Sequence, residues 1–243
     1  MSKGSSRGVR RELTDFATNQ SQYGNDLYTS FTHVPIISGF GFNQLACGDD
    51  FTLLLTNNGN VLSTGNGSAG QHCVDHFKPR FEFAAVGSDT LKDGCFEAFG
   101  IQQIAAGEAH CAALDKNGNV HLWGRNHFGE CNEKPDITKV VNTPRVVKYF
   151  KEGIERKCLM VACGGFHTLI LNQDNDIIAL GRNDSGQLGL SQNEYEHQSE
   201  PTRVTLFSDK VITNIAAGCS HSVALTVEGY SYSWGGNSHG QLA

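Results

Sequence analysis

The sequence predicts an all-β protein, a β-propeller made of repeated units, and three observations support this class. Four segments of the chain align with one another without gaps. Each segment contains two short apolar stretches joined by turn residues, which is the pattern of a β-hairpin. No stretch between them has a convincing helical pattern. Three or four antiparallel strands per unit, repeated at about 55 residues, describe the blades of a propeller.

The repeats are defined by glycines at constant spacing. The repeat cores lie near residues 46–71, 105–130, 162–187 and 216–241, and their first glycines are Gly48, Gly107, Gly164 and Gly218. A second glycine follows 11 residues later in three units, whereas the third unit has Asn175 there. Asparagine tolerates a left-handed backbone better than other non-glycine residues. This position is therefore predicted to need a positive φ in a tight hairpin turn.

Four kinds of strand are expected in each unit, in chain order. Runs such as "IQQIAAG" and "VITNIAAG" predict a strand that ends at the first glycine. The hairpin follows, formed by residues 51–56 and 61–64 in the first unit and by the equivalent residues in the others. A segment led by proline then begins at Pro79, Pro144 and Pro201. Proline suits the start of an edge strand, because its missing N–H group disturbs no ladder there.

The repeats resemble those of the RCC1-like (regulator of chromosome condensation) family, whose units carry the pattern AAGxxHxxALxxxGxVxxWGxNxxGQLG. Trp123 and Trp234 match its aromatic position, whereas Thr64 and Leu180 depart from it. The resemblance covers residues 23–243, including the remnant of an earlier unit around Pro35. It implies a seven-bladed propeller. Four units plus this N-terminal remnant are then expected to form an incomplete ring.

Composition narrows the possible partners. The net charge is −6, yet residues 1–11 contain four basic and no acidic side chains, so the remainder stands at −10. A general nucleic-acid-binding surface is therefore not expected. Residues 1–22 are expected to form a basic, disordered tail that would suit nuclear import or contact with phosphate. The family resemblance implies that such a tail can contact chromatin. The sequence shows no apolar span for a membrane, and the eight cysteines form no CxxC pair. We expect a cytoplasmic or nuclear protein, or one found in both.

Several motifs suggest chemistry, but the repeat explains them. "GNGSAG" at residues 65–70 has the spacing of a dinucleotide loop, yet the same slot is a turn in every unit. His110, His167 and His221 share one repeat position, and Phe51 occupies it in the first unit. A side chain that fills and hydrogen-bonds the space between blades is the expected role. His72, Cys73 and His76 could bind a metal adventitiously, but a solvated loop is favoured. No catalytic, cofactor or metal site is expected.

The segments that do not repeat are the candidates for recognition, because propellers mount their binding loops on a regular scaffold. Residues 83–100 form an insert that predicts an extra hairpin turning near Lys92, Asp93 and Gly94. A second variable loop, residues 190–203, carries acidic side chains that could meet a basic partner. Either segment could instead be a plain solvated loop. The candidate partner contacts are Asp89, Lys92, Asp93, Phe96, Glu194, Glu196 and Glu200.

Three classes of function remain open. The first, which we favour, is a non-catalytic module that binds a protein partner through its loops. The second, implied by the family resemblance, is a guanine-nucleotide exchange factor for a Ran-type small GTPase. In that mechanism an inserted wedge, here residues 83–100, lowers the affinity for nucleotide without acid or base chemistry. The third is a regulatory part of a larger enzyme, such as a ubiquitin ligase with a HECT domain.

Overall fold

The computed structural model describes residues 41–88, 95–96, 99–190 and 196–242. The basic tail and the remnant around Pro35 lie outside them. The described residues are almost entirely strands, turns and loops, with one short 3-10 helix, η1, at Thr205–Phe207. The expected all-β class is confirmed.

Apart from a two-stranded hairpin described below, the strands form four blades, each a sheet of antiparallel strands in chain order. Blade 1 contains β1 (Phe42–Cys47), β2 (Phe51–Thr56), β3 (Val61–Gly65) and β4 (Arg80–Ala85). Blade 2 contains β5 (Ile101–Ala106), β6 (His110–Asp115), β7 (Val120–Arg125) and β8 (Val140–Val147). Blade 3 contains β11 (Cys158–Cys163), β12 (His167–Asn172), β13 (Ile177–Arg182) and β14 (His197–Val204). Blade 4 contains β15 (Ile212–Ala217), β16 (His221–Thr226) and β17 (Ser231–Gly235).

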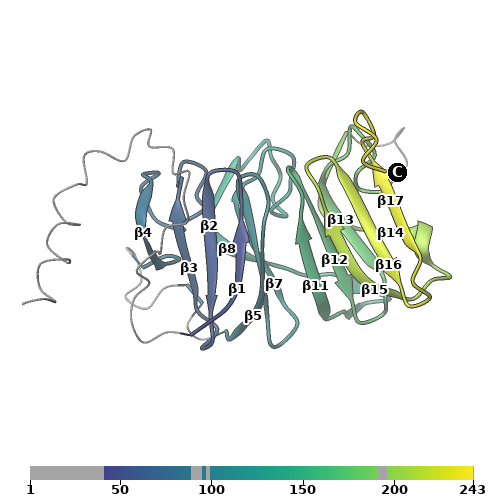
Figure 1. The fold of residues 1–243 in the computed structure, drawn as a ribbon, viewed down its shortest axis with the longest axis horizontal. Helices are drawn as coiled ribbons and strands as arrows, with labels where there is room; N and C mark the ends of the chain where they lie inside the picture. Colours follow the sequence, from purple (N-terminus) through teal and green to yellow (C-terminus); the bar gives the residue numbers. More distant parts are fainter. Residues whose placement is uncertain (1–40, 89–94, 97–98, 191–195, 243) are drawn as a thin grey trace, which may run out of the picture. The chain divides into compact units, whose positions relative to one another are not determined.

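The blades follow one another in chain order, and their first strands are neighbours (Figure 1). Glutamine side chains join these inner strands. Gln44 of β1 exchanges two hydrogen bonds with the backbone of Ile104, at 2.8 and 3.0 Å. Gln103 of β5 does the same with Val161, at 3.1 Å for each bond. A register irregularity next to each glutamine accompanies this bridge.

The first glycine of each unit is required by packing. An added Cβ at this position would lie 2.3 Å or less from a ring carbon of the residue three positions later, which is Phe51 in blade 1 and a histidine in the others. Such a distance is far inside van der Waals contact, so no larger side chain fits without a shift. The glycine and the ring therefore form one packing unit in each blade.

The repeated histidines connect neighbouring blades. Nε2 of His110 lies 3.1 Å from Oγ1 of Thr168, and Nε2 of His167 lies 2.9 Å from Oγ of Ser222. Both hydroxyls donate onward to a backbone carbonyl, of Glu130 and of Gln187 respectively. The hydroxyl proton is thus already used, so the histidine must donate from Nε2. Each relay joins two blades through three groups.

The aromatic position adds a second connection where tryptophan is present. The indole N–H of Trp123 donates to the carbonyl of Gln71 in the preceding blade, and that of Trp234 donates to Gln187, both at 2.9 Å. Leu180 has no polar hydrogen to donate, so blade 3 has only the hydroxyl bond of Thr168. The carbonyl of Gln187 thus accepts from both Trp234 and Ser222, whereas the carbonyl of Glu130 keeps the hydroxyl bond alone.

Two apolar clusters form the core. The larger one joins residues of blades 1, 2 and 3, and the smaller one joins residues of blades 3 and 4. All residues of the middle strands β6, β7 and β12 are buried. Clusters that are shared between blades arise because each blade buries its faces against its neighbours.

Two details differ from the expectation from sequence. Pro144 and Pro201 lie inside β8 and β14, each at a register irregularity of the edge strand, and do not begin these strands. A bulge leaves a backbone group unpaired, so a proline costs no ladder bond there. No strand is assigned after Ala85 in the described residues of the 83–100 insert, and its expected turn at residues 92–94 lies outside them.

Sequence reasoning missed a small hairpin between blades 2 and 3. It is formed by β9 (Phe150–Lys151) and β10 (Ile154–Glu155), and both turn residues have positive φ, 55° at Glu152 and 77° at Gly153. Two such residues define the turn type that favours tight hairpins. The adjacent Glu152 and Gly153 were the sequence signal from which this hairpin could have been predicted.

Candidate interaction surface

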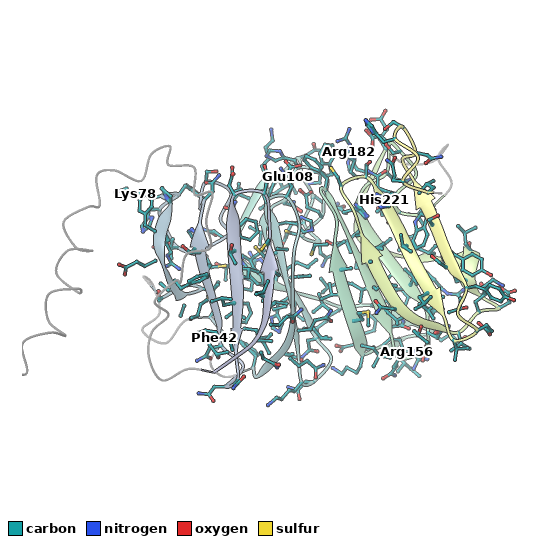
Figure 2. All side chains as sticks on the ribbon, in the orientation of Figure 1. Phe42, Lys78, Glu108, Arg156, Arg182 and His221 are labelled. Carbon is teal, nitrogen blue, oxygen red and sulfur yellow. The ribbon has the colours of Figure 1, made fainter. Side chains whose placement is uncertain are left out.

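Because the strands of each blade are antiparallel, the loops that connect them lie at the two opposite ends of the blades. We call the end where β2, β6 and β12 begin the upper rim, and the other end the lower rim. Figure 2 shows Glu108 and Arg182 at the upper rim and Phe42 and Arg156 at the lower rim. The 83–100 insert follows β4 and precedes β5, so its ends lie at the lower rim. Of the loop predicted at residues 190–203, which we call the acidic loop, residues 197–203 are instead part of β14, and Glu196 before them lies at the upper rim.

The candidate contacts therefore do not form one site. Glu196 is exposed at the upper rim, where its carbonyl accepts a hydrogen bond from the backbone of Asn183, and Glu200 is exposed on β14. Asp89, Lys92, Asp93 and Glu194 lie outside the described residues. A partner bound at one rim would meet either the insert or the acidic loop.

Phe96 belongs to the packing of blades 1 and 2. Its side chain is 2% exposed, and its ring lies 5.2 Å from that of Trp123 and 5.6 Å from that of His121, measured between centroids. Aromatic pairs at such distances contribute to stability beyond the area they bury. Phe96 is thus a residue that holds the base of the insert, and it presents little surface to a partner.

The upper rim carries a cluster of arginine and phenylalanine side chains, which we call the Arg–Phe cluster: Arg125, Phe128, Phe166 and Arg182. The guanidinium of Arg125 lies 3.8 Å from the ring centre of Phe166, and that of Arg182 lies 5.1 Å from the ring centre of Phe128. The two rings meet edge to face at 5.4 Å. Cation–π contacts of this kind hold the cluster together across blades 2 and 3.

Carboxylates neutralise both arginines of the cluster. Arg125 contacts Glu108 at 2.8 Å and Glu130 at 3.3 Å, and it also donates to the carbonyl of Gly165. Arg182 pairs with Asp184. Both cations of the cluster are paired, and the exposed carboxylates of Glu196, at the upper rim, and of Glu200, on β14, add negative charge to blade 3. The arrangement can bind a protein surface by aromatic contact and by attraction of basic side chains.

Glu130 is a buried acid beneath the cluster. The equivalent residues Gln71, Gln187 and Gln241 each accept a hydrogen bond from the backbone N–H two residues earlier, at 2.9 Å. Glu130 makes the same bond to Phe128 at 2.7 Å. Burial raises the pKa of its carboxyl above the ordinary value, against the opposing effects of this bond and of Arg125. The acid thus fixes both the loop and the arginine.

The Arg–Phe cluster was missed by sequence reasoning. Phe128 aligns with Ala69, Ser185 and His239, and Phe166 aligns with Asp50, Ala109 and Ser220. Large aromatic residues at rim positions that are small or polar in the other units were the available signal. Their contact, however, depends on how two blades meet, which the alignment of units does not reveal.

The motifs set aside on sequence grounds are structural, but the expectation of a solvated loop is wrong for His72 and Cys73, which are 1% and 3% exposed. Both ring nitrogens of His72 are within hydrogen-bond distance of partners, Oγ of Ser63 at 2.9 Å and the carbonyl of Gly65 at 3.0 Å. Gly65 and Gly70 of the "GNGSAG" stretch have positive φ, as turn residues do. Among the described residues, no group of three or more side chains is arranged to hold a metal ion, and no helix has the length and apolarity to span a membrane.

Comparison with known proteins identifies relatives of the chain. The family model described as "RCC1-like domain" matches residues 16–243. Guanine nucleotide exchange factor SRM1 of Saccharomyces cerevisiae is 31% identical over 217 residues, covering 83% of this chain and 42% of that protein. The human protein named probable E3 ubiquitin-protein ligase HERC6 is 31% identical over 207 residues, covering 82% of this chain and 18% of that protein.

A solved structure agrees in fold. The crystal structure of Prp20p from Saccharomyces cerevisiae, described with its binding properties to Gsp1p and histones, superposes with a TM-score of 0.69 at 29% identity. The match covers 83% of this chain and 47% of that one. The chain thus spans less than half the length of each of these three proteins.

Proposed function

The chain belongs to the RCC1-like family of β-propellers, and on this premise we propose that it is a regulatory module that binds a basic protein partner through its upper rim. The proposal needs no catalytic group. Its specificity comes from side chains that vary between the repeats, mounted on a scaffold whose repeated residues hold the blades together.

The Arg–Phe cluster carries the proposal. Phe128 and Phe166 are half-buried, and their geometry is set before binding by Arg125 and Arg182. Aromatic residues held in place lose little conformational entropy when a partner covers them. The exposed carboxylates of Glu196, which bonds to Asn183 at the same rim, and of Glu200 on β14 would attract a cationic surface. The histone binding described for Prp20p is the kind of interaction that fits this chemistry.

Binding of core histones to the chain, measured by biolayer interferometry, tests the proposal. We expect Phe128→Ala, and separately Glu196→Lys with Glu200→Lys, to weaken binding by about tenfold or more, since interface aromatics and charges commonly have effects of this size. The charge variant should also show a smaller dependence on salt concentration.

Phe150→Ala is the matched control, because Phe150 is 54% exposed in the β9–β10 hairpin at the lower rim. It should bind histones as the unaltered chain does. Equal affinities for the Phe128 variant and this control, or no binding by the unaltered chain, would refute the proposal.

Guanine-nucleotide exchange on a Ran-type small GTPase is the second candidate. The yeast relative named as an exchange factor and the 83–100 insert favour it. The insert cannot be removed whole to test it, because Phe96 is part of the core. We therefore choose Lys92→Glu with Asp93→Lys, and expect slower release of a fluorescent guanine nucleotide from the GTPase. If the unaltered chain does not accelerate release, exchange on that GTPase is ruled out.

A regulatory part of a larger enzyme is the third candidate, and the human relative named as a ubiquitin-protein ligase favours it. Sequencing of the full transcript would test it, because a catalytic domain in the same reading frame is required. For the first two candidates we propose a nuclear or cytoplasmic site of action, which imaging of the tagged full-length protein would establish.

A further inference from the structure

Two cysteines from different parts of the chain meet at the base of the insert. Cys73 lies in the loop between β3 and β4, and Cys95 lies near the end of the 83–100 insert, shortly before β5. Both contact the larger apolar cluster. Backbone hydrogen bonds join the segments that carry them, from Gly87 to the carbonyl of His72 and from Cys95 to the carbonyl of Val86, each 2.8 Å.

Cys73 has an unusual backbone for its type. Its φ is 53°, in the left-handed region, and the equivalent positions are occupied by Asn132 with φ 63° and Gly189 with φ 70°. Asparagine and glycine adopt this conformation readily, whereas cysteine does so rarely. Strained residues of this kind concentrate at functional sites. Glycine would fit this turn better than cysteine, so the turn does not explain why residue 73 is a cysteine.

Gly87 makes room for the second thiol. A Cβ at this glycine would lie 2.2 Å from Sγ of Cys95 and 3.5 Å from the carbonyl oxygen of Cys73. The Cys95 sulfur thus occupies the space that a side chain at residue 87 would fill, directly beside Cys73. The segments around residues 73, 87 and 95 therefore pack together at these two cysteines.

The two thiols are electrostatically different. A hydrogen bond from the Cys73 thiol lowers the pKa of Cys95, whose side chain is half-buried. Burial raises the pKa of Cys73 well above its ordinary value, so Cys73 stays protonated and acts as the donor. A thiol with a lowered pKa that solvent can reach, next to a second thiol, is the arrangement of a cysteine pair that responds to oxidants.

We propose that Cys73 and Cys95 are a redox-sensitive pair that hydrogen peroxide converts into a reversible disulfide. The Cys95 thiolate attacks the peroxide, so that an S–O bond forms, the O–O bond breaks and hydroxide leaves as water after protonation. The Cys73 thiol then loses its proton and attacks the Cys95 sulfur, forming the S–S bond and releasing a second water. The two thiols are oxidised, and one peroxide is reduced to two waters.

The disulfide would fasten the insert to blade 1. It closes a loop from residue 73 to residue 95 and constrains the segment that leads into Phe96, which packs on Trp123 of blade 2. A crosslink of this kind restricts the unfolded chain and should raise the thermal midpoint of unfolding. Oxidation would thereby stabilise the junction of blades 1 and 2.

The test treats the folded chain with graded hydrogen peroxide, blocks remaining thiols by alkylation, and maps disulfides by tandem mass spectrometry of the nonreduced digest. We expect a Cys73–Cys95 bond to form at lower peroxide than any other cysteine product, and a thiol reductant to reverse it. The thermal midpoint should rise on oxidation and fall back on reduction.

Two variants and one control make the result decisive. Cys95→Ser removes the attacking sulfur, and Cys73→Gly removes the second one while restoring the glycine found at residue 189, so this variant should fold well. Neither should form the bond or show the thermal shift. Cys219→Ser alters an exposed cysteine of blade 4 and should behave as the unaltered chain does. Oxidation of Cys95 to sulfinic acid without a bond, or bonding to Cys111 in place of Cys73, would overturn the proposal.

Discussion

At the residue scale, the repeated histidines determine how the protein responds to acid. Burial lowers the pKa of His110 to about 3 and of His167 to about 4, from 6.5, with neighbouring charges adding to the effect. Their Nδ1 atoms are buried without a hydrogen-bond partner, and Nε2 already donates. A second proton therefore has no acceptor in the folded state. The unfolded chain takes up these protons near the ordinary pKa, so acid favours unfolding.

His110→Phe tests this mechanism, because Phe51 shows that a phenyl ring fits the position. The folded pKa is depressed, so the stabilising contribution is present above pH 6.5 and is lost as the pH falls toward 3. At about pH 5 the loss is roughly 2 kcal/mol for this histidine. The variant loses one hydrogen bond, about 1 kcal/mol at all pH values. Urea unfolding should thus show a less stable variant at neutral pH and a shallower pH dependence. An unchanged pH dependence would contradict the assignment.

Glu130 offers a second prediction at this scale. Glu130→Gln restores the residue found at positions 71, 187 and 241 and keeps the acceptor for the backbone of Phe128, so we expect a change in unfolding free energy below about 1 kcal/mol. Glu130→Ala leaves that N–H and one face of Arg125 unpaired, which should cost about 2 to 3 kcal/mol. Chemical denaturation at neutral pH measures both. Similar losses for the two variants would show that the charge, and not the acceptor, is what matters.

Because the pKa of Glu130 is raised, the stability of the Glu130→Gln variant relative to the unaltered chain should depend on pH. The folded protein binds the proton of the Glu130 carboxyl more tightly than the unfolded chain does. The stabilisation that results is fully present below the ordinary pKa and is lost as the pH rises through the pKa of the folded state. Glutamine does not titrate. The difference in stability between Glu130→Gln and the unaltered chain should therefore shift in favour of the variant as the pH rises from acid toward neutral.

At the element scale, the turn residue Asn175 both supplies the left-handed backbone of a hairpin and connects two blades. Asn175 has φ 65°, which confirms the prediction made from its alignment with glycines. Its side chain also bonds to blade 4, accepting from the N–H of Ile212 at 2.7 Å and donating to the carbonyl of Lys210. Asn175→Gly should keep the turn and lose the bridge, about 1 kcal/mol. Asn175→Ala should lose both and cost about 2 kcal/mol or more. Thermal unfolding of the two variants would separate turn from bridge, and equal losses would argue against a role for the turn.

At the scale of the whole molecule, what the sequence predicts depends on whether a constraint repeats. The first glycines, the turns and the histidine relays recur because each blade meets its neighbour in the same way, so alignment of the units reveals them. The Arg–Phe cluster and the Cys73–Cys95 pair each occur once. They depend on which side chains two different segments bring together, and spacing within one repeat holds no information on that. The candidate surface was thus only partly predictable, through Glu196 and Glu200.

The way in which the core is divided into two apolar clusters also predicts which blade unfolds locally most often. Among the described residues, blade 3 is the blade that contributes to both apolar clusters, and β16 of blade 4 is less buried than β6 and β12. Backbone amides of β15 to β17 should therefore exchange with solvent about 100-fold faster than those of β5 to β7, since exchange follows local opening. Ser222→Ala removes the hydroxyl that links His167 to the carbonyl of Gln187 and should accelerate exchange in blade 4 alone. Thr168→Ala breaks the equivalent link between blades 2 and 3 and should accelerate exchange on both sides of it. Uniform acceleration in all four blades by either variant would mean that the blades unfold as one unit and that the relays do not set local stability.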